Sequence, residues 1–388
     1  MRALLTLGLS AAATVAALSC QEPPPAPKSA ANGARVELDL VVDQPGGFSS
    51  LQLPAVDSTH IYADVAGGGP IVAIDHRTGL RSWSYAREPI APSNLVRHGD
   101  ALLFVGSYAV ALDAATGAER WKVEPEIDGP LETVGGLGVS AAAGDLFYFG
   151  TDRWIFALDV ASGSERWRLE VGAGWPHPGL VRGIVVSGDT LYASVHRYHT
   201  WNGFTATAHL VAVDRRTGVE IWRHVEGDST SRHIVLLEPR VAGDLLIAAD
   251  HMKNTYFALD RATGALRWRV PSTTEGFFGP WESPTIGGDT LYGASADRLI
   301  TAIERQTGRV LWRSQVGSSA TAVIPCGGFL IAQDQGSYVL DRRDGRIISR
   351  NVHRRGGEFS LLRSRFVALG NRVFVLGDRA LYGFRCGS

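Results

Sequence analysis

A nine-residue frame, Asp-x-x-Thr-Gly-x-x-x-Trp, returns along this chain and limits what it can fold into. Intact copies span residues 75–83, 113–121, 214–222 and 260–268, and near copies span 159–167 and 304–312. A seventh copy runs from Asp341 through Gly345 to Ser349, where the Trp is lost. Successive copies begin 37 to 55 residues apart. Repetition at such a period indicates a solenoid, a propeller or an array of similar units.

The chemistry of the frame predicts β-hairpins. Gly in the frame supplies the positive φ that a tight turn needs, and the Asp carboxylate can accept hydrogen bonds from turn amides. A second turn signal, Gly-Asp, precedes most copies, at Gly99, Gly144, Gly188, Gly243 and Gly288. Each unit therefore contains about four short strands, and no helical periodicity appears after the first 34 residues. Four-stranded units repeated around an axis are the blades of an all-β propeller.

The two ends of the repeat region predict how the ring closes. Residues 36–42 alternate as a strand without a turn unit before them, and residues 370–386 supply strands without a Trp-bearing partner. If the first segment is the outer strand of the last blade, seven full repeats and one split repeat make eight blades. Such pairing leaves no open edge in the ring. A seven-bladed ring with loose termini is the alternative.

Composition fits one domain from 35 to 388. The chain has 388 residues, of which 45% are hydrophobic, so it can bury a large core. Its formal net charge of −1 gives no reason to expect nucleic acid or an acidic membrane surface as a partner.

The N-terminus predicts export and a lipid anchor. Arg2 precedes an apolar segment, residues 3–17, that is too short to span a bilayer. The sequence Ala17-Leu18-Ser19-Cys20 resembles a bacterial lipobox. We therefore expect a signal peptide over 1–19, a lipidated Cys20 and a disordered tether over 20–34. Gln21 favours the outer membrane in such lipoproteins, which places the propeller in the periplasm. A plain secretory signal is the alternative.

The repeats resemble the pyrroloquinoline-quinone (PQQ)-type propeller repeat. That family includes quinoprotein alcohol and glucose dehydrogenases, and also BamB, the outer-membrane lipoprotein of the β-barrel assembly machinery. The resemblance implies an eight-bladed, PQQ-like propeller. It implies one of two functions: a non-catalytic scaffold that docks a periplasmic or outer-membrane protein such as the barrel-assembly core, or a PQQ-binding quinoprotein oxidoreductase.

Sequence motifs favour the scaffold. Quinoprotein alcohol dehydrogenases carry a vicinal disulfide, whereas Cys20, Cys326 and Cys386 are all far apart in this chain. No haem, zinc-protease, nucleophile-elbow or phosphate-loop motif occurs. Carboxylates such as Asp113 and Asp214 are interpreted as turn residues. We therefore expect no catalytic residue, no metal and no cofactor, with PQQ as the alternative.

The cysteines and histidines raise two further points, disulfide formation and metal binding. In an oxidising periplasm Cys326 and Cys386 form either a disulfide or two free thiols, and both states stay open from sequence. Seven of the eleven histidines lie between His177 and His251. His196 and His199, three apart on a strand, would point to opposite faces, so we interpret them as ordinary loop residues rather than metal ligands.

The tryptophans divide into two groups. Those of the frame should be buried between blades as structural residues: Trp83, Trp121, Trp167, Trp222, Trp268 and Trp312. The others fall in second-to-third-strand loops or in links between blades, with Arg153 and Arg197 nearby. Aromatic and Arg side chains are common at binding hot spots. We predict that the partner contacts this face over blades three to six, through Trp154, Trp175, His177, Trp201, Arg232, Phe277, Phe278 and Trp281. The alternative is that these aromatics only plug the channel mouth.

The lipid anchor is directly testable. Metabolic labelling with a palmitate analogue should tag the protein, and Cys20→Ala should abolish the tag and release the protein from membranes. A Cys20→Ala protein that stays in the membrane fraction would contradict this prediction.

Overall fold

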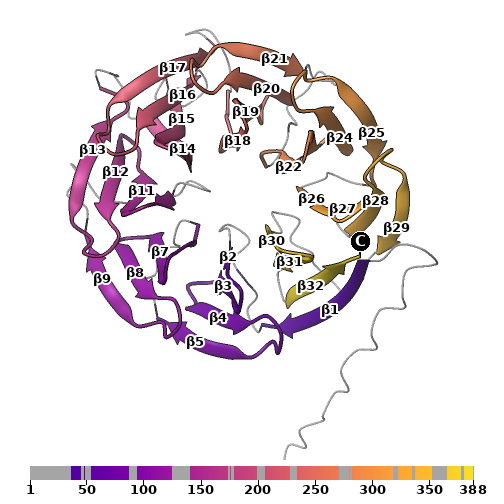
Figure 1. Ribbon diagram of the computed structural model, residues 1–388, viewed down its shortest axis with the longest axis horizontal. Helices are drawn as coiled ribbons and strands as arrows, with labels where there is room; N and C mark the ends of the chain where they lie inside the picture. The colour runs from indigo at the N-terminus through magenta and orange to yellow at the C-terminus, as the bar shows by residue number, and fades with distance from the viewer. Residues whose placement is uncertain are drawn as a thin grey trace, which may run out of the picture.

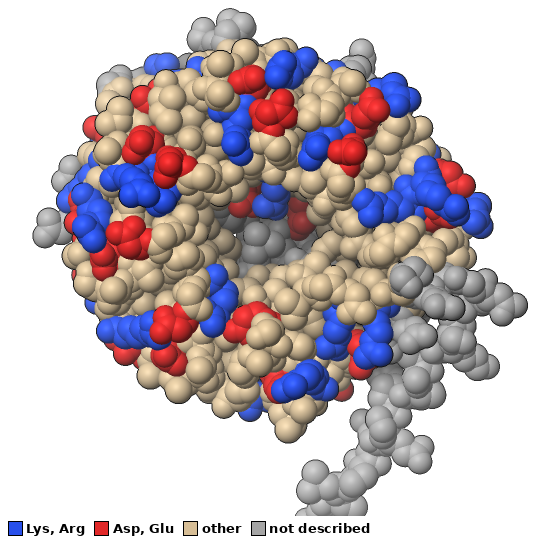
Figure 2. Space-filling view, viewed as in Figure 1, with Lys and Arg blue, Asp and Glu red and all other residues tan. Residues whose placement is uncertain are grey.

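A computed structural model of the chain describes most of the region after residue 35. The described residues are 36–44, 48, 54–86, 94–124, 140–173, 175, 179–198, 206–227, 234–270, 279, 282–317, 322–333, 337–351, 365–376 and 380–387. Within them the chain forms 32 strands, β1 to β32, and no helix. The strands form eight antiparallel sheets of four, arranged as the blades of a ring (Figure 1), and the space-filling view shows a central channel (Figure 2). An eight-bladed all-β propeller is therefore confirmed.

Blades 1 to 4 follow chain order from the channel outward. Blade 1 contains β2 (Ala55–Val56), β3 (His60–Asp64), β4 (Ile71–Asp75) and β5 (Arg81–Tyr85). Blade 2 contains β6 (Val96–His98), β7 (Ala101–Val105), β8 (Ala109–Asp113) and β9 (Glu119–Val123). Blade 3 contains β10 (Ser140–Ala143), β11 (Leu146–Gly150), β12 (Trp154–Asp159) and β13 (Glu165–Glu170). Blade 4 contains β14 (Gly179–Ser187), β15 (Thr190–Tyr198), β16 (Ala206–Asp214) and β17 (Glu220–Glu226).

Blades 5 to 7 repeat this order, and blade 8 is split between the two ends of the chain. Blade 5 contains β18 (Arg240–Ala242), β19 (Leu245–Asp250), β20 (Thr255–Asp260) and β21 (Leu266–Val270). Blade 6 contains β22 (Thr285–Gly287), β23 (Thr290–Ala294), β24 (Leu299–Glu304) and β25 (Val310–Gln315). Blade 7 contains β26 (Ala322–Cys326), β27 (Phe329–Gln333), β28 (Ser337–Asp341) and β29 (Ile347–Asn351). Blade 8 contains β30 (Arg365–Leu369), β31 (Arg372–Leu376), β32 (Ala380–Cys386) and β1 (Val36–Asp43).

Ring closure follows the predicted pairing of the two ends. In Figure 1 the indigo strand β1 lies beside the yellow strand β32, and the two are antiparallel from Val36↔Cys386 to Asp43↔Ala380. The seven-bladed alternative is therefore wrong. A disulfide joins Cys326 at the end of β26 to Cys386 at the end of β32, with 5.0 Å between the Cα atoms. Of the two states that the sequence left open, the structure has the disulfide.

Each frame forms the turn between the third and fourth strands of a blade. In blade 5, Asp260 Oδ1 accepts hydrogen bonds from the backbone N–H groups of Ala262 and Thr263 and from the Thr263 hydroxyl. Gly264 follows with a φ of +73°, where a side chain would be strained. The equivalent carboxylates Asp75, Asp113, Asp159, Asp214 and Asp341 accept backbone hydrogen bonds in the same way. Their interpretation as turn residues is confirmed.

The frame tryptophans join each blade to the next. Trp268 Nε1 donates to the carbonyl oxygen of Arg305, the residue after the frame carboxylate of blade 6, at 2.9 Å. Its ring lies against Gly308, where a Cβ would come within 2.8 Å of the indole. The same indole–carbonyl bond occurs at 2.8–3.3 Å in five other places: Trp83–Ala114, Trp121–Val160, Trp167–Arg215, Trp222–Arg261 and Trp312–Arg342. Two of the six, Trp121 and Trp268, are 8% exposed, and the other four are partly buried.

The core is divided among the contacts between neighbouring blades, which we call seams. Eight clusters of buried apolar residues occupy the eight seams, because each blade packs both of its faces against its neighbours. The second and third strands supply most of these residues, such as Phe147 and Phe156 in blade 3. A blade therefore has little core of its own, and its stability depends on the adjacent blades.

Removal of one indole tests this dependence. We expect Trp268→Ala to lower the free energy of unfolding by about 3–5 kcal/mol, the range for deleting a large buried aromatic side chain. Trp268→Phe keeps a ring but loses the donor to Arg305, so its loss should be smaller, about 1–3 kcal/mol. Leu266→Ala, on the same strand but 49% exposed, is the control and should change stability by about 0.5 kcal/mol or less. Denaturant unfolding measures all three; a Trp268→Ala loss as small as that of the control contradicts the role of the indole.

Candidate functional site

The two faces of the ring differ in construction. The face that we call the turn face carries the first-to-second and third-to-fourth strand turns, which hydrogen-bond to each other, as Ala114 N–H does to Asp100 O at 2.9 Å. The opposite face, the link face, carries the second-to-third strand loops and the links between blades. Blade 4 extends farthest at the link face. Its register begins at the turn pair Ser187↔Thr190, as in other blades. Its first three strands are nine residues long, whereas the corresponding strands of the other blades have two to seven residues.

Trp175 lies where the link into blade 4 meets this extension. Its ring is 5.0 Å from that of His209, and the Arg197 guanidinium lies over it at 5.2 Å. A Cβ on Gly179 would come within 2.7 Å of the indole, so the ring occupies space that only Gly leaves open. Trp175 is partly buried and packs on the core between blades 3 and 4. It therefore contributes to the seam as well as to the surface.

Trp154 lies at the same end of blade 3, directly opposite Glu170 in the sheet. The Arg168 guanidinium is 5.9 Å from its ring, and the Arg153 guanidinium forms an ion pair with Glu170 at 2.5 Å. Arg153 is half exposed, and Trp154 is partly buried against the core between blades 2 and 3. The structure thus places Trp154 and Trp175 at the link face, with cations on both rings.

The other residues predicted to contact a partner lie outside the described part of the chain. These are His177, Trp201, Arg232, Phe277, Phe278 and Trp281, together with the lipidation site Cys20. They stay predictions. His209 is a residue of this region that sequence reasoning missed, although its place in the alternating run from Ala206 to Asp214 put it on the same side as buried Val211 and Val213.

His196 corrects the interpretation of the histidines as loop residues. It lies within β15, is fully buried, and its Nε2 accepts a hydrogen bond from Leu236 N–H at 3.1 Å. Burial, with a smaller contribution from nearby Arg182, lowers the pKa of the imidazole to about 3. The side chain is therefore neutral, and blade 4 is long enough to enclose it because its strands continue past the usual length. His199 lies outside the described residues.

The turn face carries charges of both signs around the ring (Figure 2). Ion pairs between outer-strand Arg and frame Asp recur in the blades, including Arg120–Asp113 and Arg166–Asp159, each at 2.7 Å. These partners hold the pKa of Asp113 and of Asp159 at about 2, with the Arg hydrogen bond as the largest cause in each. The frame carboxylates are therefore ionised and already bonded within their own turns.

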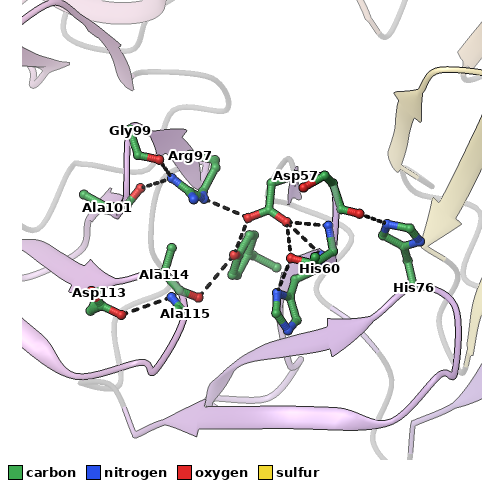
Figure 3. A network of polar contacts seen from close by, with 12 residues as sticks. Asp57, His60, His76, Arg97, Gly99, Ala101, Asp113, Ala114 and Ala115 are labelled. Carbon is green, nitrogen blue, oxygen red and sulfur yellow. Dashed lines mark hydrogen bonds and ion pairs between the residues drawn. The ribbon is translucent and has the colours of Figure 1, made fainter.

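A cavity of about 380 Å³ lies in the central channel, lined by the first strands of several blades. Its polar side chains Asn94, Arg97, Ser140 and Glu238 are bonded to the protein. Arg97 Nε donates to Asp57 Oδ2 at 2.9 Å, and Nη1 donates to the carbonyl of Gly99 (Figure 3).

Asp57 is the centre of this network and ties blade 1 to blade 2. Burial acts to raise its pKa, but hydrogen bonds from the Tyr62 hydroxyl and from the N–H groups of Thr59 and His60 outweigh burial, and the pKa lies well below its usual range. An anionic quinone such as PQQ needs free cationic partners. Among the described residues that line the cavity, the Arg97 guanidinium already donates to Asp57 and to backbone carbonyls.

The described residues contain no group of three or more His, Cys, Asp or Glu arranged to hold a metal ion. Across the same residues, no helix has the length and hydropathy of a membrane span.

Comparison with known proteins identifies the family. The family model described as outer membrane protein assembly factor BamB matches residues 105–272 and 206–382, which together cover more than half of the chain. The chain belongs to this family. No match was found among curated proteins.

Solved structures of low sequence identity share the BamB-type fold. BamB from Moraxella catarrhalis is 20% identical, with a TM-score of 0.67 over 90% of this chain and 97% of that one. Quinohemoprotein alcohol dehydrogenase from Comamonas testosteroni is 14% identical, with a TM-score of 0.70 over 91% of this chain and 76% of that one. The computationally designed Ika8 protein is 14% identical, with a TM-score of 0.68 over 89% and 98%. At these identities the matches establish the fold alone.

The buried His196 predicts a pH dependence of stability. Its folded pKa of about 3 lies below the unfolded value of about 6.5, so the unfolded chain binds more protons between these values. This contribution to stability is fully present above about pH 6.5 and is lost as the pH falls toward 3. We expect His196→Gln, which keeps an acceptor for Leu236, to flatten the pH dependence of the unfolding free energy by up to about 1.4 kcal/mol per pH unit in this window. Equal slopes in denaturant titrations of both proteins would contradict the assignment.

Proposed function

We propose that this protein is a non-catalytic scaffold that assists the assembly of outer-membrane β-barrel proteins. The observation that carries the proposal is membership of the family described as outer membrane protein assembly factor BamB. The scaffold docks a periplasmic or outer-membrane protein, such as the core protein of the barrel-assembly machinery. A lipid on Cys20 holds it at the outer membrane, with the propeller in the periplasm.

The construction of the two faces supports a docking role at the link face. Frame carboxylates on the turn face are bonded within their own turns, so they hold the hairpins together. The link face carries aromatic rings and guanidinium groups at the extended end of blade 4. Partly exposed Trp and Arg side chains on a rigid sheet suit a protein interface, because they lose little conformational freedom on binding.

The alternative is a quinoprotein oxidoreductase, which shares the propeller fold. The fold likeness to quinohemoprotein alcohol dehydrogenase at 14% identity favours it only through architecture. Commitment of Arg97 to Asp57 in the channel argues against it. Quinone absorbance in the purified protein, with dye reduction that depends on added PQQ, would support this alternative over the scaffold.

The scaffold is tested by recovery of the partner from crosslinked membranes. We expect the wild-type chain to recover the barrel-assembly core protein. Trp175→Ala, Trp201→Ala and Trp281→Ala together should reduce that recovery at least about tenfold, a change of about 1.4 kcal/mol in binding. The matched control is the triple variant Arg77→Ala, Arg216→Ala and Arg343→Ala, which removes exposed side chains from the turn face.

Folding must be measured beside recovery, because Trp175 also packs in the seam. Circular dichroism and thermal unfolding of each variant separate lost binding from lost structure. A folded link-face variant with undiminished recovery would place the contact elsewhere. If wild-type protein recovers no barrel-assembly component, the proposed function is wrong.

A further inference from the structure

The eight seams are not joined in the same way. Six of them, from blade 1/2 to blade 6/7, carry the bond from a Trp indole to the carbonyl of the residue after the frame carboxylate. The two seams of the closure blade, 8/1 and 7/8, have no such Trp. Each therefore needs another contact to hold the ring closed.

Seam 8/1 replaces the indole by an arginine. Arg372 Nη1 in blade 8 donates to the carbonyl oxygen of His76 at 2.9 Å, and His76 follows the frame carboxylate Asp75 of blade 1. The same guanidinium also donates to Asp39 in β1 at 3.0 Å. Val42 of β1 takes the place of the indole ring, since a Cβ on Gly79 would lie 3.0 Å from its Cγ2. This seam therefore has a hydrogen-bond donor, a carbonyl acceptor and an apolar side chain against the turn Gly, as the Trp-containing seams do.

Seam 7/8 shows no equivalent of these parts among the residues that the structure describes there. Ser349 pairs with Val339 at the register position where Trp312 pairs with Ala302 in blade 6. Its hydroxyl is buried and has no hydrogen-bond partner within the described structure. The apolar cluster of this seam is the smallest as well: it has six buried members, two of them the cysteines, whereas the described residues give the other seams nine to twelve.

The disulfide occupies two positions that other seams use for a link. Cys386 N–H bonds to Asn371 O, as Arg215 N–H bonds to Asp189 O and Arg342 N–H to Gly328 O, so Cys386 corresponds to the residue after the frame carboxylate. Cys326, like Ala143 and Gly287, is the last residue of a first strand.

In two other seams the Arg that follows the frame carboxylate donates a hydrogen bond to the last residue of the first strand in the preceding blade. Arg215 donates to Ala143 O at seam 3/4, and Arg342 donates to Gly287 O at seam 6/7. Cys386 and Cys326 connect the same two positions at seam 7/8 by a covalent bond.

We propose that the Cys326–Cys386 disulfide is a redox-sensitive lock on the ring, and that its reduction opens the propeller at seam 7/8. A dithiol supplies the two electrons and two protons. Its thiolate attacks one sulfur of the disulfide and displaces the other as a thiolate, and its second thiol then resolves the mixed disulfide. The reductant ends as a cyclic disulfide, and both cysteines end as thiols.

Reduction and opening are coupled because the two cysteines are buried, at 1% and 7% exposure. A reductant reaches the buried sulfur atoms through a local opening at this end of the seam, and cleavage of the bond then allows blades 7 and 8 to separate. Once the bond is broken, seam 7/8 retains a small apolar cluster and no indole. Strand β32 also holds β1, starting at the pair Val36↔Cys386, so separation exposes the closure pairing to unzipping from that end. The other seams keep their own links.

Amide hydrogen exchange, resolved by peptide, tests the lock on the full chain. Differential alkylation with mass spectrometry first establishes that Cys326 and Cys386 are bonded in untreated protein and free after treatment with dithiothreitol. In the reduced protein we expect exchange in β1, β26 and β30–β32 to rise at least about tenfold, while β11 and β12 in blade 3 stay unchanged. The double variant Cys326→Ala/Cys386→Ala should give the same pattern without reductant.

The double variant is also the matched control, because dithiothreitol should not change its exchange any further. Unchanged exchange in β1 and β32 after full reduction would overturn the proposal. So would an equal rise in every blade, since the ring would then not open at one seam. Free thiols at both positions in untreated protein would overturn it as well. None of these outcomes depends on the proposed scaffold function.

Discussion

The hydrogen bond from an indole N–H to a backbone carbonyl of the next blade is the interaction on which this ring depends. It fixes the distance and angle between neighbouring sheets, because the indole ring must also lie flat on the Gly of the next turn. A ring closes only if all eight angles add up to a full turn. The contact therefore has to be repeated nearly unchanged, or replaced by one that spans the same gap, as Arg372 does beside Val42. This requirement explains why Asp, Gly and Trp recur at constant spacing within the frame while the links between blades vary in length.

Most of the fold was predictable from sequence for the same reason. The nine-residue frame contains both the turn residues and the Trp that contacts the next blade. Asp260, Gly264 and Trp268 alone therefore indicate a hairpin that packs against the neighbouring blade. Pairing of β1 with β32 followed from counting strands. The replacements at the closure blade were not predictable. Arg372 and Cys386 lie outside any copy of the frame, and only the register of β31 and β32 shows which positions they occupy.

The candidate site was predictable only in part. Loop aromatics indicated the link face, and the structure places Trp154 and Trp175 there. The burial of His196 could not be foreseen, because nothing local in VHRYH separates a loop from a strand that continues four residues beyond the usual length. That extension is set by tertiary contacts, in which the backbone N–H of Leu236, in the link into blade 5, donates a hydrogen bond to the buried His196 ring. The same extension makes blade 4 the part of the link face that differs most from its neighbours, although its frame is one of the intact copies.

The two unusual parts of the ring lie on opposite sides of it. Blade 4, which carries the extended link face, stands across the channel from blade 8 (Figure 1). Because each blade shares its core only with its two neighbours, a break at seam 7/8 turns the closed ring into a linear array in which blade 4 keeps both of its seams. Side-chain packing around Trp175 would survive such a break. The curvature across blades 3 to 6 would then be held by the indole contacts of those seams alone, without the added constraint of a closed ring. A partner that contacts several blades at once would therefore sense the redox state of a disulfide that it never touches, whereas a partner bound to blade 4 alone would not.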